Sequence, residues 1–396
     1  MAPLSAAAVV GEARSTRPGN IGWLFALGHG HYTQFLNFRE CFPEEREGSA
    51  RWIGLEYATS GDPLSALRFV PFSVRLRRNV LWHARNGLAA RKSWDALFLA
   101  VEQASLRPIV ARHRSYLYTD LTPSLKRELA PWYDHQLSGN RLVGQLRTRY
   151  ARRLYRAARG VFTMSEWSAG GVRRDYGVDP GRVHVSLPGA NLRRWHHVDR
   201  HSRSGPVRVL MIGGDFHRKG GNMLLDWAET TAETGWELDM VTWPGDLPAW
   251  AWELLGRPAP DQRVSASLAP RLPNVRIHCG LQANGPEIGA LLEAADVFCL
   301  PTMADGSSIA SLEAMATGLP VLVGAVGGIP ELIEDCRTGF LLRPGDAADL
   351  ADKLGAVLRD PALRHTVGAA ARRACEEHLN VGRQVRDILA VIDREQ

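Results

Sequence analysis

Two carboxylates stand eight positions apart in the stretch Asp305-Gly-Ser-Ser-Ile-Ala-Ser-Leu-Glu313. The apolar run Ala295–Leu300 before them is typical of a strand, and Pro320 opens a second one, so a β-α-β connection is predicted between them. Asp305 then lies in the loop before the helix, and Glu313 lies about one and a half turns into it. An inward-facing carboxylate in this apolar helix needs a polar partner, and a ribose diol can serve as one. The alternative is a loop Asp and a solvent-facing helix Glu.

The start of this predicted helix is itself a candidate binding site. Ser307 or Ser308 can act as its N-cap, and Gly318 ends it. Unpaired backbone N–H groups and the positive end of the helix dipole meet at Gly306, Ser307 and Ser308. Such a position suits a phosphate or a sugar hydroxyl.

A glycine-rich loop that contains two cations is a second candidate binding site. The strand predicted at Val207–Ile212 runs into Gly213-Gly-Asp-Phe-His-Arg-Lys-Gly-Gly221. Gly213 and Gly214 let the backbone approach a ligand closely, while Arg218 and Lys219 stand at a helix start. Two cations there can neutralise the charge that develops on a diphosphate leaving group. An ordinary surface turn is the alternative.

Candidates in the first half carry weaker signals. A predicted strand over 21–27 is followed by Gly28, His29 and Gly30, whose glycines can admit a ligand from a facing domain. Asp120, in the segment Tyr118-Thr-Asp-Leu-Thr-Pro123, is a further polar candidate after a predicted strand. The alternatives are plain loop histidines and an aspartate that caps its own loop.

Strand-like and helix-like runs alternate along the whole chain, which predicts an α/β protein of two domains. In the first half, further strands are expected at Trp94–Val101 and within Pro108–Tyr118. The polar segment after Asn191 lacks periodicity and is predicted to be a linker. The predicted divisions are a disordered leader (1–19), a first domain (20–190), a linker (191–206), a second domain (207–375) and a C-terminal helix (376–396).

Composition sets broad limits on the class of protein. The 396 residues carry a net charge of +6, but residues 1–200 hold 30 Lys and Arg against 16 Asp and Glu. An anionic partner such as a lipid headgroup, or a general bias toward arginine, can account for this basic half. The five scattered cysteines show no metal-ligand spacing, which favours a reduced, cytoplasmic protein. Peripheral contact with the inner face of the membrane is a second option, whereas no nucleic-acid recognition motif is present.

The stretch from Leu312 through Pro320 and Gly-Gly-Ile-Pro-Glu331 to Thr338-Gly-Phe-Leu-Leu-Arg-Pro-Gly-Asp346 resembles the nucleotide-sugar signature of retaining glycosyltransferases of family 4. The resemblance covers most of residues 207–375. It implies the GT-B fold, in which two Rossmann-like doubly wound domains face a cleft. It also implies a final helix that crosses back to the first domain.

The same resemblance implies roles for individual residues. Asp305 would bind hydroxyls of the donor hexose, Glu313 the ribose, and Lys219 the diphosphate. The segment around Asp120 resembles one at the interdomain cleft in a subset of the family, so Asp120 would orient the donor sugar or the acceptor. The family usually has Glu where this chain has Asp305, and Arg where it has Gly214, for which Arg218 is a candidate substitute.

The function implied is transfer of a hexose from a nucleotide-diphosphate sugar to an acceptor hydroxyl of a glycan, a lipid-linked molecule or a small molecule, with the first domain binding the acceptor. No metal and no further cofactor are expected. A nucleotide-sugar binding protein without turnover and a phosphorylase of the same fold are the alternatives. The sugar, the base, the acceptor and the oligomeric state stay open.

Overall fold

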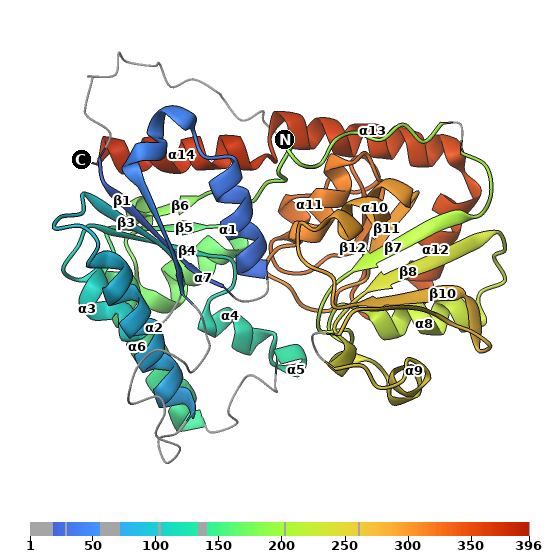
Figure 1. The fold of residues 1–396 in the computed structure, drawn as a ribbon, viewed down its shortest axis with the longest axis horizontal. Coiled ribbons are helices and arrows are strands. Elements are labelled where there is room, and N and C mark those ends of the chain that lie inside the picture. The colour runs from blue at the N-terminus through green and yellow to red at the C-terminus, as the bar shows by residue number, and fades with distance from the viewer. Residues whose placement is uncertain are drawn as a thin grey trace.

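The computed structural model describes residues 19–27, 30–55, 72–101, 104–133, 141–201, 203–259 and 262–395. Of the leader predicted over residues 1–19, all but Gly19 lies outside the described residues. Two α/β domains stand side by side, each built on its own sheet (Figure 1).

The first-domain sheet has six strands in the order β2-β1-β3-β4-β5-β6, and all neighbouring pairs are parallel. The strands are β1 Ile21–Ala26, β2 Ala50–Leu55, β3 Ala96–Ala100, β4 Ser115–Thr119, β5 Gly160–Thr163 and β6 Val183–Val185. The chain moves to one side of β1 for β2 and to the other side for β3. In doubly wound sheets, ligands bind at the carboxyl ends of the strands beside such a reversal.

Helices cover both faces of this sheet because side chains alternate along each strand. Leu97 and Leu99 pack into the apolar cluster shared with α2, α3, α6 and α7, while Phe98 packs on the opposite face with α1. The first-domain helices are α1 Gly30–Glu40, α2 Phe72–Leu88, α3 Arg107–Val110, α4 Pro123–Glu128, α5 Ala130–Tyr133, α6 Arg141–Ala157 and α7 Glu166–Tyr176, with short 3₁₀ turns η1 Glu44–Ser49, η3 Ala104–Leu106 and η5 Pro180–Arg182.

The strand predicted within Pro108–Tyr118 is shorter than expected. Its first part is the helical turn α3, and only Ser115 onward is strand. Pro108 cannot donate a sheet hydrogen bond, and its fixed φ suits the first turn of a helix. The edge strand β2 was not predicted, since its half-exposed residues lack a continuous apolar run.

The second-domain sheet has seven strands in the order β13-β12-β11-β7-β8-β10-β9, and only the β9–β10 pair is antiparallel. The strands are β7 Val207–Ile212, β8 Trp236–Val241, β9 Val264–Leu268, β10 Leu272–Cys279, β11 Val297–Leu300, β12 Val321–Gly324 and β13 Phe340–Leu342. The helices are α8 Gly221–Thr230, α9 Ala249–Leu254, α10 Pro286–Ala294, α11 Ile309–Ala316, α12 Ala347–Arg359 and α13 Pro361–Glu377, with 3₁₀ turns η6 Pro244–Asp246 and η7 Ile329–Glu331.

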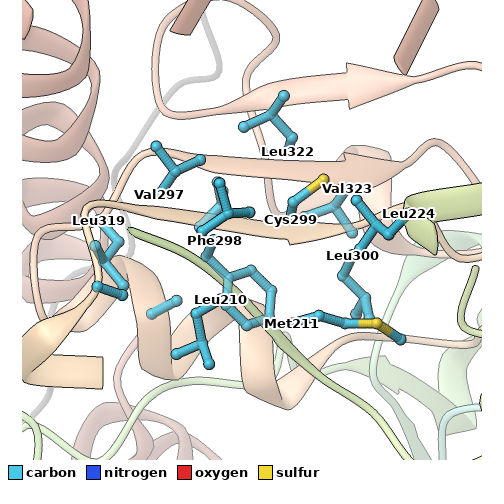
Figure 2. Packing of buried hydrophobic residues seen from close by; sticks show 14 of the residues in the cluster. Leu210, Met211, Leu224, Val297, Phe298, Cys299, Leu300, Leu319, Leu322 and Val323 are labelled. Carbon is cyan, nitrogen blue, oxygen red and sulfur yellow. The ribbon is translucent and has the colours of Figure 1, made fainter. Parts of the chain in front are cut away.

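The core of the second domain lies around its central strands (Figure 2). Leu210, Phe298 and Leu322 come from the adjacent strands β7, β11 and β12, and all are buried. Burial in this apolar cluster also raises the pKa of the Cys299 thiol. Because neighbouring parallel strands end at the same edge of a sheet, this core holds the loops after β7 and β11 next to each other.

The last helix, α14 Val381–Arg394, leaves the second domain and packs on the first (Figure 1). Its apolar face, which includes Val385 and Ile388, joins the cluster on the α1 side of the first sheet. Gln384 donates a 2.7 Å hydrogen bond to the Tyr118 hydroxyl, and Arg46 forms a 2.7 Å ion pair with Asp393. Among the described helices, none is both long and apolar enough to cross a bilayer.

The segment predicted as a linker packs firmly on the second domain. Trp195 is buried in the second-domain core. Arg200 donates to the carbonyl oxygens of Leu292, Ala295 and Thr317, near the C-terminal ends of α10 and α11. A cation at these positions satisfies carbonyl groups that have no partner within their helices.

Candidate functional site

The two loops that carry the candidate residues meet at the carboxyl edge of the second sheet. The loop after β7 ends in Lys219, and the loop after β11 contains Asp305. The backbone N–H of Met303 donates to the carbonyl oxygen of Arg218 at 2.8 Å, which joins the loops directly. The structure therefore brings together residues that are about 86 positions apart in the chain.

Lys219 and Asp305 form an ion pair, in which the ammonium donates to Oδ2 of the carboxylate. Their side chains are only 16% and 10% exposed, so the pair is largely shielded from water. Gly213 lies beside the lysine stem, where a Cβ would stand 3.0 Å from Lys219 Cγ. Glycine at this position makes room for the lysine side chain.

Arg218 is held by protein groups on several sides. Its Nε donates to Asp215 at 2.7 Å, and Nη1 donates to the Ala304 carbonyl at 2.7 Å and to the Tyr133 hydroxyl at 3.2 Å. Burial works to lower the pKa of Arg218, but the neighbouring Asp305 and other acidic groups raise it overall. Within the described part of the chain, Nη2 makes no hydrogen bond, so a phosphate that Arg218 binds would be met by this atom.

The loop before α11 packs against the first domain. Ser308 is the N-cap of α11, and its Oγ accepts from the Ser311 N–H at 3.3 Å. A Cβ on Gly306 would lie 3.0 Å from the Asp120 carbonyl oxygen and 3.1 Å from its Oδ2. Ser307 Oγ lies 3.4 Å from the sulfur of Met164, also in the first domain. Asp120 therefore stands directly at the start of this helix.

Glu313 faces inward from α11 and is 6% exposed. Burial raises the pKa of its carboxyl group to about 8. The Trp195 indole lies beside the carboxyl group without reaching hydrogen-bond geometry, and Glu313 Oε1 has no hydrogen-bond partner among the described residues. A buried carboxyl oxygen without a partner is uncommon in folded proteins, which makes Glu313 a candidate for contact with a ligand.

Gly214 has a packing reason to be glycine. A Cβ there would lie 2.4 Å from Cε2 of Trp243, whose indole rests on the Gly214 backbone. Trp243 follows β8 and is 43% exposed. An arginine at position 214 would have to displace this indole, so the packing of Trp243 requires a residue without a side chain here.

A segment of the first domain reaches across to these loops. Leu121, Leu125 and Tyr133 form a small apolar cluster with Ala304 of the second domain. Figure 1 shows α4 and α5 extending from the first domain toward the second. The Tyr133 ring also lies under the Arg218 guanidinium, 4.8 Å from its centroid. This segment, residues 121–133, covers one side of the Arg218 loop.

A second contact between the domains joins Glu331 to the start of α7. Its carboxylate accepts hydrogen bonds from the N–H groups of Glu166 at 2.6 Å and Trp167 at 2.8 Å. A carboxylate is favourable at a helix N-terminus because it meets unpaired donors and the positive dipole end. Glu331 thus fixes α7 of the first domain to the turn after β12.

The remaining candidates in the first domain are only partly described. Gly28 and His29 lie outside the described residues, and Gly30 is the first residue of α1. Tyr133, Trp243 and Glu331 were not predicted as site residues. Their contacts are made across the fold. No local sequence signal marks Tyr133 or Trp243, and the signature that contains Glu331 does not indicate its contact with α7. In the described ranges, no group of three or more His, Cys, Asp or Glu side chains could hold a metal ion.

Comparison with known proteins gives a family match for the second domain. Residues 196–374 match the family model described as glycosyl transferases group 1. The chain is 28% identical over 231 residues to an MMP alpha-(1->4)-mannosyltransferase of Mycolicibacterium hassiacum, an alignment that covers 57% of this chain and 52% of that protein. The chain therefore spans about half the length of this relative.

Solved structures extend the likeness to the whole fold. Sucrose-phosphate synthase from Thermosynechococcus elongatus has a TM-score of 0.71 at 16% identity, covering 95% of this chain and 99% of that one. Anabaena HepE in complex with UDP-glucose has a TM-score of 0.65 at 17% identity, covering 94% and 99%. These similarities confirm the predicted fold, two Rossmann-like domains of the GT-B type.

Proposed function

We propose that this chain is a glycosyltransferase that moves a hexose from a nucleoside-diphosphate sugar to an acceptor hydroxyl. One observation carries the proposal. The shielded Lys219–Asp305 pair lies at the carboxyl edge of the second sheet, and the buried Glu313 lies on the helix that follows. All three residues fall within the region that matches the group 1 glycosyl transferases.

In this proposal, Lys219 binds the donor diphosphate. Its ammonium is neutralised by Asp305, so an incoming diphosphate takes the place of that carboxylate beside the lysine. Asp305 then accepts hydrogen bonds from hydroxyl groups of the hexose. Arg218 adds a second positive charge through Nη2 while its other donors stay on protein partners.

Glu313 binds the ribose. Its Oε1 has no partner among the described residues, and a carboxyl oxygen can accept a hydrogen bond from one of the two ribose hydroxyls. Because burial has already removed Oε1 from water, a hydrogen bond from ribose meets a need that the free protein leaves unsatisfied.

The transfer step then depends on position and charge. The bond from the anomeric carbon to the diphosphate oxygen breaks, and the acceptor oxygen bonds to that carbon. The acceptor proton passes to the departing phosphate oxygen, whose negative charge Lys219 and Arg218 stabilise. Asp120, which contacts Gly306 at the start of α11, is placed to orient the hexose or the acceptor.

The finer features of the proposal are those of the family 4 enzymes that the motifs resemble: retention at the anomeric carbon and transfer without a metal ion. A cytoplasmic reaction in glycan biosynthesis fits the composition and the cysteine pattern. Anabaena HepE was solved with UDP-glucose, which makes UDP-sugars the first donors to test, with GDP-sugars next.

The test is a thermal-shift screen of UDP- and GDP-linked hexoses. A ligand at a hundred times its Kd adds about 2.7 kcal/mol of stability, which corresponds to roughly 5–10 °C in a domain of this size. At least one nucleotide sugar should give such a shift, and incubation without acceptor should slowly release free nucleotide. Stabilisation without any release favours the binding-protein alternative, and no shift with any donor contradicts the proposal.

A further inference from the structure

A basic hollow of about 240 Å³ lies on the first domain, away from the site described above. It is formed by the C-terminal part of α2, the segment before β3, and α3 with the turn that follows it. The lining includes four cations and a histidine: Arg85, Arg91, Lys92, Arg112 and His113. Among the described residues, no carboxylate lines it.

The hollow is at the opposite end of the first sheet from the donor site. Trp94 and His113 precede β3 and β4, whereas Asp120 follows β4 and contacts the second domain. A five-residue strand is about 17 Å long, so at least this distance separates the hollow from the cleft edge. A ligand bound here does not take part in the transfer step.

No acid in the described residues forms an ion pair with a cation of the hollow. In the part of the chain that the structure describes, Arg85, Lys92 and Arg112 form no ion pair. Arg91 donates to the Asn20 side chain and the Gly48 carbonyl, both uncharged. Asp95 is a nearby acid, but it accepts from the Asn20 N–H at 2.6 Å and does not line the hollow.

The chemistry of the lining defines a ligand class. Guanidinium groups match phosphate oxygens with paired N–H donors, and converging cations favour a group that carries more than one negative charge. Leu88, Trp94 and Ile109 add an apolar wall. The Trp94 indole is held in place, since its N–H donates to the Leu88 carbonyl at 3.0 Å. A phosphate attached to an organic group fits both parts of this lining.

We propose that this hollow is a second anion site, which binds the phosphate group of an organic phosphate independently of the donor site. Two sources share this chemistry: a soluble phosphorylated metabolite and the headgroup of an anionic phospholipid. The inference stands on the geometry of the first domain and does not depend on the proposed transferase activity.

The test is a calorimetric titration with inorganic pyrophosphate in a Lys219→Ala background, which removes binding at the proposed donor site. Lys92→Ala/Arg112→Ala should weaken the remaining binding roughly hundredfold, since each lost charge-assisted hydrogen bond costs about tenfold. The charge-retaining pair Lys92→Arg/Arg112→Lys should keep most of the affinity. An unfolding temperature of the alanine pair equal to that of the charge-retaining pair shows that its loss of binding is not misfolding.

The control is Arg149→Ala/Arg153→Ala, which removes two exposed arginines of α6 outside the hollow. This pair lowers the net charge equally and should change pyrophosphate binding less than twofold. A parallel arm measures co-sedimentation with phosphatidylcholine vesicles that contain or lack phosphatidic acid.

If Lys92→Ala/Arg112→Ala loses pyrophosphate binding and the α6 control keeps it, a soluble phosphate is supported as the ligand. If Lys92→Ala/Arg112→Ala loses binding to phosphatidic-acid vesicles and the α6 control keeps it, a lipid headgroup is supported. The proposal is overturned when neither probe binds, or when the hollow and α6 variants lose binding equally. Failure of the transferase proposal would leave all of these readouts unchanged.

Discussion

The substitution Glu313→Gln should remove a pH-dependent loss of stability. Burial raises the pKa of Glu313 from its ordinary 4.5 to about 8, so the folded state holds this proton to higher pH than the unfolded state. The folded state then loses stability as the pH rises from about 4.5 to about 8. By linkage, the loss is about 1 kcal/mol at pH 5 and about 3 kcal/mol at pH 7.

Glutamine has nearly the same shape and no charge, so this loss is absent from the variant. A buried amide introduces a cost of its own, but that cost does not change with pH. The informative quantity is therefore the difference in unfolding temperature between variant and wild type, followed from pH 5 to pH 8. It should shift in favour of the variant by roughly 4–8 °C between pH 5 and pH 7, at about 2–4 °C per kcal/mol.

Differential scanning calorimetry measures this difference, with Glu253→Gln as the matched control because Glu253 is 59% exposed on α9. The control should follow the wild-type pH profile. Parallel profiles for wild type and Glu313→Gln would refute the reasoning, because they would show that Glu313 titrates alike in the folded and unfolded states.

Three further substitutions test contacts around the site. Tyr133→Phe keeps the ring under Arg218 but removes the 3.2 Å hydrogen bond, and should lower the free energy of unfolding by about 1 kcal/mol in chemical denaturation. No change would mean that this hydrogen bond does not contribute to stability. Gly214→Ala places a Cβ against the Trp243 indole and should change the tryptophan emission spectrum. The same substitution made in a Trp243→Phe protein should not change it, which assigns the effect to Trp243. Unchanged emission in the single variant would contradict the packing described. Glu331→Gln weakens the cap on α7 by about 1 kcal/mol. The radius of gyration from small-angle X-ray scattering should rise, because the domains separate more often. An unchanged radius of gyration would show that other contacts hold the domains together.

The placement of the residues proposed for the donor site could be predicted because their sequence signals are local. Lys219 and Asp305 each follow a buried strand, and Ser308 has the residue type and position of an N-cap. Parallel strands end at a common edge, so placing each loop after its strand was enough to bring the loops together.

Contacts between the domains could not be predicted in the same way. Tyr133 meets Arg218 across 85 positions, and Glu331 meets Glu166 across 165. Each depends on how the two domains face each other, which no periodicity or motif encodes. The unpredicted strand β9 has a related cause, since Val264-Ser-Ala-Ser-Leu268 acquires its strand structure mainly by pairing with β10.

The central claim is that Lys219 and Glu313 hold a nucleotide sugar on the second domain. The most direct measurement is calorimetric titration of the best donor from the screen into wild type, Lys219→Ala and Glu313→Ala, with Lys353→Ala, on α12, as the control. We expect both site variants to bind at least tenfold more weakly and Lys353→Ala to bind as wild type does. Unchanged affinity in both site variants would contradict it.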